Sequence, residues 1–97
     1  MSFPTKHPAE RVYAGTDWSR VLANGETIAS AEVFITSKNL AADPNASVML
    51  SGITSVNGNI VSHLLIGGVE NVLYITTWRI VTSTPRTLEE RVTLSVA

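Results

Sequence analysis

The stretch that decides the fold reads VLYITTWRIVT (residues 72–82), STPR (83–86) and TLEERVTLSV (87–96). Both longer segments are rich in β-branched and aromatic residues, which favour strands, and the proline between them favours a turn. The second segment also alternates: its apolar side chains share one parity, and only Glu90 interrupts that row, which consists of Leu88, Val92, Leu94 and Val96. The stretch therefore predicts a β-hairpin.

The pairing of the two strands follows from the size of their side chains. Directly opposed residues on antiparallel strands share a face, and aromatic rings supply the most buried area. We therefore expect Trp78 to lie near Val92 and Tyr74 near Val96, above the apolar row of the second strand.

This pairing leaves a second apolar row on the other face of the first strand. A strand that is apolar on both faces is either central in a sandwich or covered by a partner, and we favour a partner. The charged residues of the hairpin are then either a solvated cross-strand set or the polar rim of an interface. The candidate interface residues are Leu73, Ile75, Val81, Arg79 and Arg91.

Composition bounds the class of protein. A chain of 97 residues suggests one domain with a modest core. The net charge is −1 and only 15% of residues are charged, so no basic stripe suggests a nucleic-acid partner. The absence of cysteine excludes disulfides and thiolate metal sites. No apolar run approaches the ~20 residues that cross a bilayer, so we expect no membrane contact.

Four further strands are predicted outside the hairpin, over residues 11–18, 26–36, 48–54 and 60–66. Asn57-Gly58-Asn59 predicts a hairpin turn, and Gly52 predicts a bulge. Six strands, or seven, without a long helical pattern favour an all-β fold, an immunoglobulin-like antiparallel β-sandwich. Tyr74 lies where such sandwiches place a corner tyrosine. Residues 1–10, which include two prolines, are expected to form a flexible N-terminal arm, and residues 11–97 the single sandwich domain.

No residues with catalytic or metal-binding spacing stand out. Of the two histidines, His7 falls in the arm and His63 is expected on a solvent face, and neither has a convergent partner. Asp17 is expected to cap the following turn through the amide of Ser19 or Arg20. The remaining acids, Glu26 among them, are scattered over predicted loops and solvent faces. We therefore predict no enzyme activity and no catalytic, cofactor-binding or metal residues.

Several segments together resemble a known family. They are YAGTDWSRVL (13–22), GETIAS (25–30), Gly67-Gly68, Tyr74-Ile75-Thr76, Thr82-Ser83 and ERVTLSV (90–96). In this order they resemble small virion proteins of tailed bacteriophages, described as fiber–tail or head–tail adaptors. One departure is the last turn, where the family has glycine and this chain has Pro85, whose fixed φ also suits a turn.

The resemblance implies an immunoglobulin-like virion structural protein without catalytic residues. It implies protein–protein contacts with tail, neck or fiber components, a homo-oligomer in the particle, and synthesis in the bacterial cytoplasm. Two alternatives stay open. One is a carbohydrate- or receptor-binding module on a virion or bacterial surface, although its aromatics usually lie on loops, and here Trp18, Trp78, Tyr13 and Tyr74 fall within predicted strands or at their ends. The other is an assembly chaperone absent from the finished particle.

Overall fold

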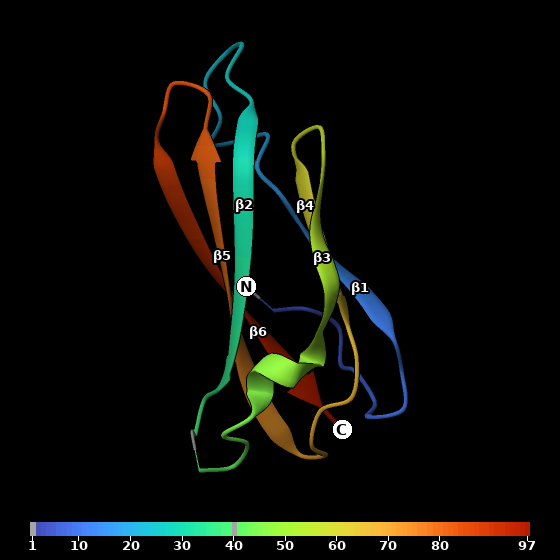
Figure 1. Cartoon of the computed structure of the whole chain (residues 1–97). Helices are drawn as coiled ribbons and strands as arrows, with labels where there is room; N and C mark the ends of the chain where they lie inside the picture. Colours follow the sequence, from blue (N-terminus) through green and yellow to red (C-terminus); the bar gives the residue numbers. More distant parts are fainter. Residues whose placement is uncertain (1, 40) are drawn as a thin grey trace.

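The computed structural model describes residues 2–39 and 41–97, which form two packed β-sheets (Figure 1). The strands are β1 (Val12–Asp17), β2 (Ile28–Ser37), β3 (Leu50–Asn57), β4 (Ile60–Leu65), β5 (Val72–Thr82) and β6 (Thr87–Val96), and one 3-10 helix, η1, spans Ala46–Met49. Both sheets are antiparallel, with the orders β1-β4-β3 and β2-β5-β6. The predicted all-β sandwich is confirmed. Its strand order is the one that immunoglobulin-type sandwiches use for strands B to G.

The C-terminal hairpin forms as predicted, with no helix across it and with Trp78 and Tyr74 fully buried. The predicted pairs were wrong by two positions, because Trp78 lies opposite Glu90 and Tyr74 lies opposite Leu94. A shift of two residues leaves every side chain on its predicted face. The alternation therefore identified the buried side of the hairpin but not its register.

The turn sets the register. The backbone N–H of Thr82 donates to the carbonyl of Arg86 at 2.8 Å, and the N–H of Arg86 donates to the Thr82 hydroxyl at 2.9 Å. These two bonds close the loop at Ser83–Pro85. Because the side chain that fixes the closure is a threonine inside the strand, strand composition alone did not reveal it.

Both tryptophans of the chain are buried in the same local arrangement. The indole N–H of Trp18 donates to the hydroxyl of Thr16, and that of Trp78 donates to the hydroxyl of Thr76, at 2.8 Å in each case. Residues two positions apart on a strand point to the same face, so each threonine is placed to accept. The Thr76 hydroxyl donates onward to the carbonyl of Val92 at 2.7 Å. The sandwich thereby buries large rings without leaving their one polar atom unpaired.

Tyr74 occupies the expected corner at the start of β5. Its hydroxyl accepts from the N–H of Val69 at 2.9 Å and donates to the Asp43 carboxylate at 2.7 Å. Burial, together with the bond to Asp43, raises the pKa of Tyr74. The loop before β5 and the loop before η1 are tied together at this end of the sandwich.

The remaining turn signals were informative. Gly52 has φ 73°, and the β3–β4 pairing is interrupted between Ser51 and Ser55, which confirms the predicted bulge. The hairpin at Asn57-Gly58-Asn59 also forms, with Asn57 opposite Ile60. One boundary was wrong: Val48 begins no strand and belongs to η1. That helix turns Ala46 and Met49 into the core and leaves Val48 exposed.

The described part of the N-terminal segment lies against the domain, unlike the flexible arm expected over residues 1–10. Ser2 and Lys6 form isolated parallel bridges with Thr93 and Val96 of β6. Between these two residues, the ring of Phe3 packs edge-on against the Trp78 indole, with the ring centroids 5.9 Å apart. These contacts place residues 2–6 along the edge of β6, as part of the sandwich.

Lys6 has the least expected position in this segment, because it is 1% exposed. Its ammonium donates to the carbonyls of Gly67 (2.6 Å) and His7 (2.8 Å), so the buried charge is hydrogen-bonded. Burial lowers the pKa of Lys6. The prolines that suggested a loose arm carry no information about this burial, which depends on a carbonyl 61 residues away.

Replacement of Trp78 by alanine tests the core. We expect Trp78→Ala to lower the free energy of unfolding by about 3–5 kcal/mol, because it removes a fully buried ring and leaves a cavity. Chemical denaturation measures this change. Tyr13→Ala is the matched control: Tyr13 is 76% exposed, and its loss should change stability by no more than about 0.5 kcal/mol. Equal effects of the two substitutions would contradict the assigned core.

Candidate functional site

The five candidate interface residues lie on one surface, the outer face of the sheet β2-β5-β6. Along β5, residues of odd number point outward, whereas Tyr74, Trp78 and their even-numbered neighbours point into the core. We call this surface the outer β5 face. It comprises Phe34 from β2, Leu73, Ile75, Thr77, Arg79 and Val81 from β5, and Glu89 and Arg91 from β6.

The apolar part of the outer β5 face is partly open to solvent. Leu73 is 37% exposed, and Ile75 and Val81 are half-buried between the flanking strands. Thr77 and Arg79 separate Val81 from Ile75 along the strand. The structure thus brings the predicted residues together as a mixed surface, in which a short apolar strip is followed by a charged row.

Arg79 is the centre of the charged row. Its Nη2 lies 3.1 Å from Oε1 of Glu89, and its guanidinium lies 5.3 Å from the centroid of the Phe34 ring. Glu32 is directly opposite Arg79 on β2. Since the Arg79 and Glu89 side chains are 44% and 38% exposed, their ion pair contributes little to folding. Its effect is to hold a cation over the face of the sheet.

Phe34 is the aromatic member of this face, and it is not among the five predicted residues. It is 41% exposed and lies opposite Thr77. Its parity differs from that of Val33 and Ile35, which are buried. The parity of Phe34 can be read from the sequence, whereas its place beside β5 depends on the topology of the sheet.

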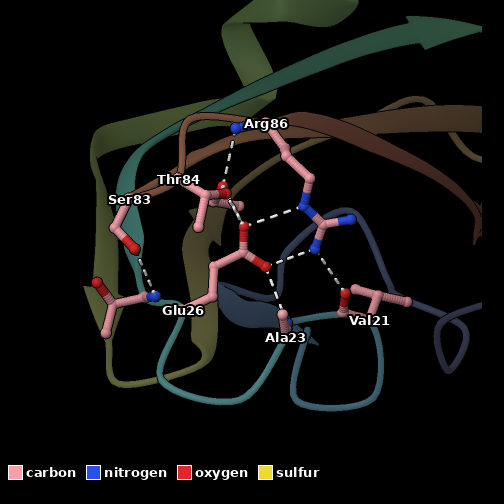
Figure 2. A network of polar contacts seen from close by, with 8 residues as sticks. Val21, Ala23, Glu26, Ser83, Thr84 and Arg86 are labelled. Carbon is pink, nitrogen blue, oxygen red and sulfur yellow. Dashed lines mark hydrogen bonds and ion pairs between the residues drawn. The ribbon is translucent and has the colours of Figure 1, made fainter.

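A buried carboxylate organises one end of the sandwich (Figure 2). The side chain of Glu26, which we expected at the surface, is 1% exposed. It accepts from Nε of Arg86 at 3.0 Å and also from Nη2 of Arg86. The hydroxyls of Thr82 and Thr84 donate to the same carboxylate, as does the N–H of Ala23 at 2.8 Å. Every donor within reach therefore favours the charged form of Glu26.

This network joins the β1–β2 connection to the β5–β6 turn. Arg86 also donates to the carbonyl of Val21 at 3.0 Å (Figure 2). The N–H of Thr27 donates to the Ser83 hydroxyl, and the N–H of Ser83 donates to the carbonyl of Thr27. The bonds from Arg86, and then those from the threonine hydroxyls, hold the pKa of Glu26 far below its usual range. Arg86 is a charged residue of the C-terminal hairpin, but it does not join Arg79 and Arg91 on the outer β5 face, because its partner is a carboxylate 60 residues away.

His63 is a second correction. We expected it on a solvent face, but it is 5% exposed and lies opposite Ala14 on the inner side of β4. Its Nδ1 is 3.0 Å from the Thr54 hydroxyl, and within residues 2–39 and 41–97 its Nε2 has no hydrogen-bond partner. Burial lowers the pKa of His63. The face was misassigned because β4 is apolar on both parities, so alternation did not separate its inner side from its outer side.

Asp17 makes a local contact, within the turn that follows β1. Asp17 accepts from the N–H of Ser19 at 2.9 Å, which confirms the predicted cap. Within the described part of the chain, no three His, Asp or Glu side chains are grouped so that they could hold a metal ion. No helix formed by those residues has the length and apolar character needed to span a membrane.

The fold and this surface define a class, that of small structural β-sandwich modules whose exposed sheet face mixes apolar and charged side chains. A comparison with protein-family models gives the particular family. The model for the podophage GP4 fiber-tail adaptor protein gp77 matches residues 6–95, and the chain belongs to this family. No curated protein matches the chain. The family assignment confirms the resemblance to phage tail adaptors and supports a structural role in the virion.

Replacement of Glu26 tests the network at the loop end. We expect Glu26→Ala to lower the melting temperature, since it leaves the Thr82, Thr84 and Arg86 donors without their shared acceptor. Glu32→Ala, which removes an exposed carboxylate from the middle of β2, is the matched control and should change it far less. Thermal unfolding at neutral pH measures both. Equal melting temperatures for the two variants would show that the buried carboxylate does not fasten the loops.

The pH dependence of stability tests His63. Its pKa is lowered in the folded state, so below the unfolded value of about 6.5 the unfolded chain binds a proton that the folded chain does not. Stability should therefore fall as pH decreases through this range, by at most about 1.4 kcal/mol per pH unit. Denaturation between about pH 7.5 and 5.5 measures the slope. His63→Gln should flatten it, and His7→Gln is the control for the loss of an imidazole. A slope unchanged in His63→Gln would contradict the assignment.

Proposed function

We propose that this protein is a non-enzymatic virion component that joins tail, neck or fiber elements through protein–protein contacts made by its outer β5 face. The family supports a structural role in the particle. The choice of surface is supported by one observation: the partly exposed apolar side chains of β5 and Phe34 are rimmed by Arg79, Glu89 and Arg91. Apolar centres with polar rims, enriched in aromatic residues and arginine, are typical of protein interfaces.

The rigidity of the scaffold favours this use of the surface. β5 is hydrogen-bonded to a neighbour on both sides and carries fully buried aromatic residues on its inner face. Its outward side chains are therefore held in position before a partner arrives, which lowers the cost of ordering them on binding.

The distribution of aromatic rings supports protein contacts over sugar binding. Trp18, Trp78 and Tyr74 are buried, so they offer no ring for stacking against a sugar. The exposed Tyr13 lies on a strand of the opposite sheet. A glycan array provides the direct comparison, and saturable binding there would favour the receptor-binding alternative.

Charge substitutions on the outer β5 face test the proposal. We expect Ile75→Asp and Leu73→Asp each to weaken binding to the purified tail and fiber proteins of the same phage by about tenfold or more, because each places a carboxylate in the apolar strip. Biolayer interferometry measures the change. Ile53→Asp is the matched control, since Ile53 is 88% exposed on β3, in the other sheet.

Two results would count against the proposal. Unchanged binding by Leu73→Asp, with a wild-type melting temperature, would remove this face from the interface. Unfolding of the isolated domain on Ile75→Asp would show that this part of the face is core.

A further inference from the structure

The free edge of β1 is an open sheet edge in the described chain. The edge of β6 is covered in part by residues 2–6, β3 is bulged at Gly52, and β2 is irregular between Ile28 and Ser30. β1 pairs with β4 in an unbroken register over six residues, contains no proline or lysine, and has no strand on its other side among the described residues (Figure 1). Natural proteins usually block such edges, because unpaired backbone groups there recruit another strand.

The hydrogen-bonding pattern shows which groups face this edge. The N–H of Trp18 donates to the carbonyl of Asn59, which continues the β1–β4 register by one pair. Hydrogen-bonded residues alternate along an antiparallel pair, so the even-numbered positions of β1 bond to β4. The N–H and C=O groups of Tyr13, Gly15 and Asp17 therefore point away from β4, toward the free edge.

We propose that the β1 edge pairs antiparallel with β1 of a second copy of this chain, in a register centred on Ala14. The segment from Arg11 to Asp17 is self-complementary in that register. Arg11 lies opposite Asp17 of the second copy, Tyr13 lies opposite Gly15, and each pair occurs twice. Opposite charges and an aromatic ring over a glycine are both favourable cross-strand pairs.

The exposure of these side chains fits the pairing. Tyr13 is 76% exposed, although it lies within a strand, and beside it Gly15 leaves the outer face of the sheet bare. The carboxylate of Asp17 is exposed and accepts from the N–H of Ser19 through Oδ1, so it is accessible to a guanidinium of the second copy. No like charges oppose each other in the proposed register.

Two hollows between the sheets flank the same edge. One, of about 300 Å³, is bordered by Phe3, Val12, Leu65 and Leu94, and the other, of about 360 Å³, by Gly15, Thr16, Arg20 and Glu90. An added strand would lie beside both hollows and turn its own Val12 and Thr16 toward them. Constant-type immunoglobulin sandwiches hold a fourth strand at this place, beside the strand that corresponds to β1.

The dimer that results joins two three-stranded sheets into one continuous sheet of six strands. A single strand pair buries less area than a standard stable interface, so association should depend on concentration. The proposal does not rest on the outer β5 face, which belongs to the other sheet, and the two can fail separately.

Charge reversal gives the sharpest test. In a homodimer of Arg11→Asp, two pairs of acidic residues lie opposite each other, and in a homodimer of Asp17→Arg, two pairs of basic residues do. Each variant alone should therefore dimerise at least about tenfold more weakly than wild type. A mixture of the two variants restores both opposite-charge pairs and should form a heterodimer. Analytical ultracentrifugation measures the association, for which a dimer has twice the chain mass of 10.4 kDa. Binding of tail and fiber proteins through the other sheet serves as the control and should persist in both variants.

Hydrogen exchange supplies a second readout that does not depend on how well the variants fold. The amides of Tyr13 and Gly15 should gain protection in wild-type protein as concentration rises, whereas the amide of Ile53 at the β3 bulge should not. Three results would overturn the proposal: wild-type protein that stays monomeric at every concentration, a variant mixture that associates no better than its components, or amides of Tyr13 and Gly15 that stay unprotected in a dimer.

Discussion

The contact between the Trp78 indole and the interior of the sandwich is the one on which the rest of this structure depends. A ring of this size fills the space between the sheets only if its N–H finds an acceptor there. The hydroxyl of Thr76 accepts from this N–H and donates its own hydrogen to the carbonyl of Val92. β5 and β6 are therefore joined by a side-chain hydrogen bond as well as by their backbone hydrogen bonds. The ring of Phe3 packs edge-on against this indole, and this contact helps to hold the N-terminal segment along β6.

Polar groups fasten both ends of this small core. At one end the Glu26 carboxylate gathers donors from the β1–β2 connection and from the turn after β5. At the other end the Tyr74 hydroxyl links the loops before β5 and before η1. A domain of this size has little apolar area to spare, and loops cost entropy when they are ordered. Satisfied buried groups at the ends fix the loops without a larger core, provided that every donor and acceptor is paired.

The sequence was sufficient to predict the local features. Alternation identified the buried face of β6, and glycine and asparagine located the hairpin at residues 57–59 and the bulge at Gly52, because these signals act within a few residues. The sequence was insufficient to predict the burial of Glu26, Lys6 and His63. Glu26 and Lys6 take partners about 60 residues away, and a lone acid or lysine looks the same in sequence whether it is paired or solvated. For His63, the parity signal failed because both faces of β4 are apolar.

The candidate face shows the same boundary between what sequence can and cannot predict. All five predicted residues lie together on the outer face of one sheet, since parity along β5 was enough to group them. The contribution of Phe34 required knowing that β2 lies beside β5, which is a property of the topology.

The two proposed contacts use different physics, and the sandwich allows both at once. On the outer β5 face, recognition would depend on side chains, because the backbone of β5 is already bonded on both sides. At the β1 edge, recognition would depend mainly on backbone groups, with Arg11 and Asp17 selecting the register. The two surfaces belong to different sheets, so occupation of one does not cover the other. An adaptor needs such an arrangement, because a protein that joins two components must keep one surface available after the other is bound.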